Sequence, residues 1–165
     1  MMVEITFQMV LSTLQTVGLL VGIFYYIMTL RNAQKSRDAQ IFLQFSNKTA
    51  TKNWQNGMNH IRQLEFSSYE DLVEYRENNP DEWSDIRYVF GVIEDFGGLV
   101  RGGYLNINIV AITSSTNIIR AWETLQPIID EIRSRARTRV WSEMEYLYNQ
   151  LILFKKRNPK LYKVS

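Results

Sequence analysis

The sequence predicts an all-α protein, in which one N-terminal transmembrane helix is followed by a small cytoplasmic helical bundle. Residues 5–30 contain no charged side chain, and about 20 apolar residues in a helix suffice to cross the hydrocarbon core of a bilayer. After this run, apolar residues recur every three or four positions, as on one face of an α-helix. We therefore expect a transmembrane anchor at 1–31, a bundle domain at 32–157 and a basic tail at 158–165.

The uncharged run is more typical of a membrane span than of a buried core helix or a cleaved signal peptide. A buried core helix is usually shorter and keeps a polar face. A cleaved signal peptide has a basic leader and a small-residue cleavage site, whereas this chain begins MMVE and the run ends in TLRNAQ. The run therefore predicts a single-pass protein of the cell membrane.

The charges that flank the span predict its orientation. Glu4 is the only charged residue before it, whereas Arg31, Lys35 and Arg37 follow it closely. Because basic residues accumulate on the cytoplasmic side, we expect the N-terminus outside and the C-terminal domain in the cytoplasm. We also expect Arg31, Lys35 and Arg37 to contact lipid headgroups.

Polar and small residues repeat along one face of the predicted span. Gln8, Gln15 and Gly22 are seven residues apart, and Gly18 and Gly22 form a G-x-x-x-G pair. Such a face favours contact between helices in lipid, because small residues allow close approach and amides can hydrogen-bond across the contact. Chance is the alternative, since glycine is common in transmembrane helices. We expect self-association or contact with another membrane protein through this face.

The first half of the bundle domain contains four predicted helices. The membrane helix is expected to continue to about residue 45, with a break or kink at 46–47. The next predicted helix has Trp54, Met58, Ile61 and Leu64 on one face. The capping-box pattern Ser67–Glu70 starts a short helix that ends at 78–79. Pro80, with Asn79 as cap, starts the next helix, and Gly102-Gly103 ends it.

The second half predicts two longer helices. Residues 104–113 alternate in polarity, but a lone strand would have no pairing partner, so we expect the start of a helix there. A helix over 115–135 carries a core stripe, and Pro127 predicts a kink or break inside it. A last helix covers 138–156, and Pro159 follows its end.

Three stretches carry a resemblance to a known family: the span leading into LRNAQKSRDAQIFLQFSN, the block VFGVIEDFGGLVRGGYLN, and RAWETLQPIIDEIR before an aromatic-rich last helix. Together they resemble an uncharacterised family of small prokaryotic single-pass membrane proteins with a helical cytoplasmic domain, a domain of unknown function. The resemblance implies the topology described above. It assigns no activity and no catalytic residue.

Few residues in the chain could carry chemistry. There is no cysteine and only one histidine, His60, which excludes disulfides, thiolate catalysis and clusters of cysteine or histidine around a metal. We expect His60 to be a structural or surface residue. Glu94 and Asp95 project about 100° apart on a helix, which suits a shared reaction poorly. We expect Glu94 to be a half-buried carboxylate paired with an arginine such as Arg101, with a functional acid as the alternative.

Charge is segregated along the chain although the net charge is only +2. Residues 65–95 are rich in acids, whereas basic residues crowd the junction before the last helix and the tail; they are Arg133, Arg135, Arg137, Arg139, Lys155, Lys156, Arg157, Lys160 and Lys163. Internal pairing or simple solvation would explain this, and a basic surface held against anionic lipid is the alternative. We expect no nucleic-acid partner, because no basic–aromatic interleaving is present.

The sequence therefore predicts a membrane-anchored accessory or scaffold protein that acts through protein–protein contacts, with no cofactor and no catalysis. The alternative is a membrane-tethered regulator that binds a small ligand or anionic lipid through its helical domain. For that alternative, the candidate pocket residues are the four tryptophans, Trp54, Trp83, Trp122 and Trp141.

Overall fold

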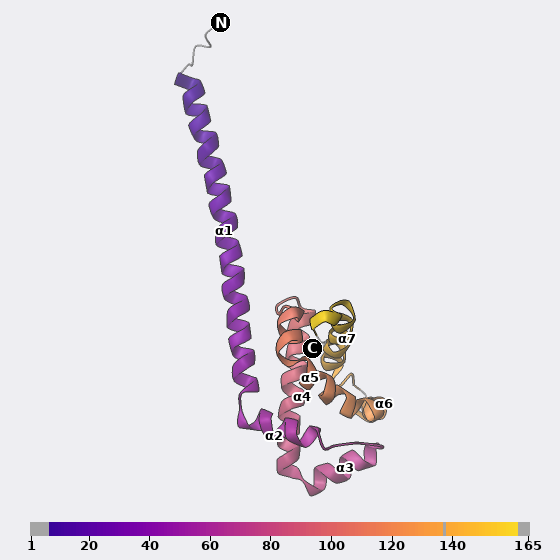
Figure 1. The fold of residues 1–165 in the computed structure, drawn as a ribbon. Coiled ribbons are helices and arrows are strands. Elements are labelled where there is room, and N and C mark those ends of the chain that lie inside the picture. Colours follow the sequence, from indigo (N-terminus) through magenta and orange to yellow (C-terminus); the bar gives the residue numbers. More distant parts are fainter. Residues whose placement is uncertain (1–6, 137, 162–165) are drawn as a thin grey trace. The chain divides into compact units, whose positions relative to one another are not determined.

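The computed structural model describes residues 7–136 and 138–161, and every regular element in these ranges is a helix (Figure 1). The expected all-α fold is therefore confirmed for this part of the chain. The described residues divide into two compact units, with the boundary between Gln40 and Ile41. Glu4, Arg137 and Lys163 lie outside the described residues.

The first unit is the apolar part of α1, a helix that runs without interruption from Phe7 to Thr49. All side chains from residue 7 to residue 37 are exposed. Among the described residues, α1 is the one helix that is long and apolar enough to cross a membrane. No break occurs at 46–47, because α1 continues through these residues to Thr49. Thr51 then caps α2, and its Oγ1 accepts a hydrogen bond from the Trp54 N–H at 3.2 Å.

The second unit consists of the end of α1 and all later helices. In chain order these helices are α2 (Lys52–Ile61), α3 (Tyr69–Asn78), α4 (Pro80–Arg101), α5 (Ile107–Leu125), the 3-10 turn η1 (Gln126–Ile128), α6 (Ile129–Ala136), α7 (Ser142–Arg157) and the 3-10 turn η2 (Pro159–Leu161).

A capping box starts α3, one residue later than the sequence pattern predicts. Ser68 Oγ accepts a hydrogen bond from the Asp71 N–H at 3.1 Å, and the Asp71 carboxylate accepts from the Ser68 N–H at 3.0 Å. The Ser67 N–H also donates to Asp71. Hydrogen bonding of the Asp71 carboxylate, first with the Ser68 hydroxyl and then with the N–H groups of Ser67 and Ser68, holds the pKa of this carboxyl below its usual range. An aspartate thus performs the reciprocal role that the sequence pattern assigns to Glu70.

The fourth helix begins and ends where the sequence predicts. Pro80 is its first residue, because a proline there loses no hydrogen bond. Asn79 occupies the cap position, but its side chain donates to the Tyr75 carbonyl and does not cap α4. At the other end Gly103 has φ +72°, a left-handed conformation that glycine adopts without strain, and the helix stops there.

The last two predicted helices have other boundaries than expected. A helix starts within 104–113, as expected, because α5 begins at Ile107 after the Asn106 cap. It continues without interruption through residue 115, where a separate helix was expected to begin. Pro127 breaks it from α6 through a 3-10 turn, which confirms the expected break. The last helix starts at Ser142 and not at 138, because Trp141 has the left-handed φ of 55° and its ring packs against Phe90 at 5.4 Å.

The core of the second unit is organised around α4, which packs against α2 and α7. Two glycines make these crossings close. A Cβ at Gly57 of α2 would overlap the backbone carbonyl of Asp85, and a Cβ at Gly97 of α4 would overlap that of Glu143 in α7. Apolar side chains from all these helices fill the space between them; those that are almost completely buried include Ile61, Ile86, Val89, Phe90, Ile93, Ile118, Leu125, Met144, Leu147 and Leu151.

We predict that Gly97→Ala destabilises the protein while Gly91→Ala does not. The new methyl group at 97 meets the backbone of α7, so the two helices must separate, which typically costs about 1–3 kcal/mol. Gly91 lies in the same helix with open space around its Cβ position, so alanine there should stabilise by about 0.5–1 kcal/mol. Urea unfolding of both variants in detergent, followed by circular dichroism, measures the difference. Equal stability of the two variants would contradict the close crossing.

Candidate functional site

The candidate association face lies on α1, as the sequence predicts. Gln8, Gln15, Gly18 and Gly22 are on one uninterrupted helix, and all four residues are exposed. A Cβ at either glycine would meet no atom within 4 Å. Neither glutamine forms a side-chain hydrogen bond with the described residues. This face therefore has open space and free amide groups, the two features that another helix could use.

Three threonine hydroxyl groups of the same segment are already satisfied. Thr13, Thr16 and Thr29 each donate to the carbonyl oxygen four residues earlier, at 2.8, 2.9 and 2.9 Å. In lipid such internal bonds remove the cost of an unpaired hydroxyl. The two amide side chains have no such internal partner, so they have more to gain from a second helix than these threonines do.

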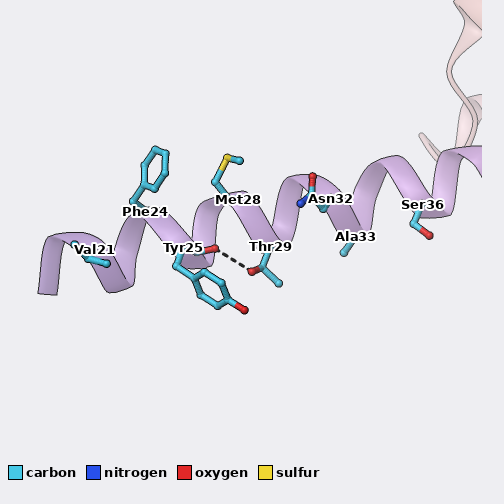
Figure 2. Close-up of a pocket in the computed structure, with 8 residues that line it drawn as sticks. All are labelled: Val21, Phe24, Tyr25, Met28, Thr29, Asn32, Ala33 and Ser36. Atoms are coloured by element: carbon cyan, nitrogen blue, oxygen red, sulfur yellow. Dashed lines mark hydrogen bonds between the residues drawn. The ribbon is translucent and has the colours of Figure 1, made fainter. Parts of the chain in front are cut away.

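A shallow groove follows α1 where the uncharged run ends. It is lined by Val21, Phe24, Tyr25, Met28, Thr29, Asn32, Ala33 and Ser36 (Figure 2). Figure 2 shows two rows of side chains spaced by four residues, with Phe24, Met28 and Asn32 on one side and Tyr25, Thr29 and Ala33 on the other. Rows of this kind are the ridges between which another helix can pack.

The candidate headgroup contacts come directly after the uncharged run and overlap the end of this groove in sequence. Arg31, Lys35 and Arg37 are exposed on α1 and form no ion pair with any described residue. Arg31 and Lys35 are four residues apart and so share one side of the helix. Their charges are available to an external anion.

In the second unit the only histidine belongs to a small polar cluster. Glu82 Oε2 accepts a hydrogen bond from the Tyr75 hydroxyl at 2.6 Å and lies 3.2 Å from His60 Nδ1. Burial, followed by the hydrogen bond to Glu82, raises the pKa of Tyr75 above its usual range, so the phenol stays protonated. The cluster joins α2, α3 and α4, which gives His60 a structural role. Sequence reasoning missed the cluster, because its three members come from three helices.

Glu94 is half-buried as expected, but its expected partner is wrong. Its Oε2 accepts a hydrogen bond from the Met144 N–H at 2.7 Å, in the first turn of α7. Trp141, at the cap position of that helix, gives no side-chain hydrogen bond, so Glu94 of α4 supplies the missing acceptor. Arg101 pairs instead with Glu143 at 2.9 Å.

Part of the segregated charge is paired within the fold. Arg135 hydrogen-bonds to Glu131 and Glu70, which raises its pKa, and its guanidinium lies over the Tyr69 ring at 4.3 Å. Arg133 pairs with Glu145 at 2.8 Å. Outside this junction, Lys48 pairs with Asp95 at 2.8 Å. The internal pairing that the sequence suggests is thus present between Arg135, one of the basic residues before α7, and Glu70, in the acid-rich segment 65–95.

The tryptophans expected as pocket residues lie in the core. Trp54, Trp83 and Trp122 are buried among apolar side chains, and Trp141 is half-buried against them. Two surface hollows of this unit are lined by other residues, which include Glu70, Glu74 and Arg135 in one and Glu65, Arg120 and Pro127 in the other. No group of three or more His, Asp or Glu side chains among the described residues could hold a metal ion.

These features define an all-α protein with one long apolar helix and a separate helical domain. The family model described as "Domain of unknown function (DUF4760)" matches residues 12–151, and the chain belongs to this family. The match confirms the resemblance to a domain of unknown function. No curated protein and no solved structure matches the chain.

We predict that Glu94→Ala destabilises the protein more than Asp95→Ala does. The first change leaves the Met144 N–H without its charged acceptor and should cost about 2 kcal/mol. The second removes only an exposed ion pair with Lys48, typically worth less than about 1 kcal/mol. Thermal or urea unfolding of the two variants checks the order. If Asp95→Ala proved the more damaging, the capping role of Glu94 would be refuted.

Proposed function

We propose that the apolar part of α1 crosses the cell membrane once, with the N-terminus outside and the helical domain in the cytoplasm. The exposed apolar side chains of residues 7–30 support this placement, because their contact with water is unfavourable whereas contact with lipid chains is favourable. The family match begins at residue 12, so it includes most of the apolar run. The basic side chains Arg31, Lys35 and Arg37 would then lie at the cytoplasmic headgroups.

We further propose that the protein is an accessory or scaffold component of a membrane assembly and acts through protein–protein contacts. The observation that carries this proposal is the unpartnered face of α1, with the free amides of Gln8 and Gln15 and the open surface at Gly18 and Gly22. An unpaired amide in hydrocarbon is costly, so contact with a second span would relieve that cost. The partner is another membrane protein or a second copy of this chain, and no catalysis is assigned.

Purification from membranes in mild detergent tests this function. We predict that the full chain elutes with a partner membrane protein in fixed stoichiometry or as a homo-oligomer, measured by the intact mass of the complex. A partner would then supply the process that the chain serves. Elution as a monomer without partners would overturn the accessory role and leave the tethered regulator as the remaining hypothesis. Because the tryptophans are packed in the core, such a regulator would bind its ligand at the surface of the helical domain.

We predict that Gly18→Ile combined with Gly22→Ile weakens association of α1 in membranes. The branched side chains fill the open face and keep the backbones apart, and a loss of about 1 kcal/mol or more is expected, about fivefold in the dissociation constant. Energy transfer between labelled chains in vesicles measures it. Leu20→Ile combined with Ile27→Leu is the matched control, because at about 100° per residue both positions lie on the opposite side of the helix. Unchanged association in the glycine variant would remove the α1 face from the proposal.

A further inference from the structure

One end of the helical domain is built from segments that contain no carboxylate side chain. Residues 96–122 and 146–161 have no Asp or Glu, and their charged side chains are all basic. These segments include the loop from α4 to α5, most of α5, and most of α7. Figure 1 shows the yellow C-terminal end of α7 at the same end of this unit as the α4–α5 loop, consistent with the packing of α7 on both α4 and α5.

The exposed side of α7 carries free cations at this end. Leu153, Lys156 and Arg157 on α7 are exposed, and so is Lys160 in the following turn η2. Lys156, Arg157 and Lys160 form no ion pair or side-chain hydrogen bond with the described residues. In contrast, Arg101, at the end of α4, is held by Glu143. Three cations of this end are therefore available to an external anionic surface.

Helix dipoles explain only part of this distribution. Basic side chains in the last turn of a helix interact favourably with its C-terminal carbonyls, which accounts for Lys156 and Arg157. The same effect favours acids in the first turn of a helix, and α3, α4, α6 and α7 have them. The first turn of α5 has none, and Asn106 caps it with a neutral amide. The first turn of α2 also has no acid, so this absence in α5 is not unique to this end. Glu143, which borders the end at the start of α7, has its carboxylate paired with Arg101.

Exposed apolar side chains lie in the same segments. Ile112 on α5 is 72% exposed, Tyr104 in the α4–α5 loop is 56% exposed, and Leu153 on α7 is 43% exposed. Apolar and aromatic side chains among cations are typical of surfaces that lie in the headgroup region of a membrane. Simple solvation of a charged surface does not account for them.

We propose that this acid-free end of the helical domain, with Lys156, Arg157 and Lys160 at its centre, docks on the anionic headgroups of the bilayer. The proposal rests on the proposed membrane span, which keeps the domain at a high effective concentration beside the cytoplasmic leaflet. The acids of α3 and of the first turn of α4 would be repelled by the same surface. Docking would therefore orient the domain and leave the α3 end free for a protein partner.

A label on α7 in the full chain tests this docking. The chain has no cysteine, so Asn149→Cys gives a single site for a fluorophore on an exposed position of α7. The labelled chain is placed in nanodiscs of phosphatidylcholine, or of phosphatidylcholine mixed with phosphatidylglycerol, that contain a headgroup-bound quencher. We expect stronger quenching in the anionic discs, and its loss at high salt.

Charge reversal separates docking from net charge. Each basic side chain near an anionic surface contributes about fivefold to binding. Lys156→Glu combined with Arg157→Glu should therefore lower the equilibrium constant for docking by about 25-fold or more. Arg76→Glu combined with Arg87→Glu changes the net charge equally, at exposed positions of α3 and α4 without ion pairs in the described structure, and should leave quenching unchanged.

Two failures remain distinguishable in this experiment. If the chain does not enter the discs, the proposed span fails, and the docking that rests on it fails with it. If it enters the discs but quenching is the same in neutral and anionic lipid, or falls equally in both charge variants, the docking surface alone is overturned. Quenching that resists salt in neutral discs would indicate that apolar contact or the tether alone holds this end near the bilayer, and it would equally overturn docking on anionic headgroups.

Discussion

The close crossings of α4 with α2 and α7 are the constraint on which the helical domain depends. Both rely on a glycine, Gly57 or Gly97, whose missing side chain lets a backbone carbonyl of the next helix occupy that space. The crossing at Gly97 also brings Glu94 to the first turn of α7, where it accepts a hydrogen bond from the Met144 N–H. Packing distance thus decides which polar groups meet, because a hydrogen bond forms only when the helices are close enough.

The charged side chains on the surface of the helical domain fall into a paired group and an unpaired group. Some opposite charges pair across the domain, as Arg135 and Glu70 do, and these pairs join α6 to α3. Lys156, Arg157 and Lys160 have no ion pair with the described residues, and residues 96–122 and 146–161 contain no acid. A span in the membrane and a charged end beside it would act together, since each interaction favours the other by limiting diffusion.

Much of the fold was predictable, because local rules determine it. Proline at a first helical position, glycine after a last turn and the Pro127 break all acted where expected. The errors came from side chains whose role depends on another helix. Val140 fits the apolar period of α7, yet the helix starts later, because Trp141 turns toward Phe90. Glu94 and Arg101 share a helix and were expected to pair, but α7 offers each of them a better-placed partner.

The sequence by itself determined the all-α class, the uncharged run of α1 with its glutamines and glycines, and the separation of acids from bases. These follow from periodicity and composition, which are local properties of the chain. Only the tertiary structure decided that the tryptophans fill the core, that His60, Glu82 and Tyr75 form one cluster, and that the free cations share an end with exposed apolar groups. Those relations join residues far apart in sequence, and only the packing of the helices fixes such distances.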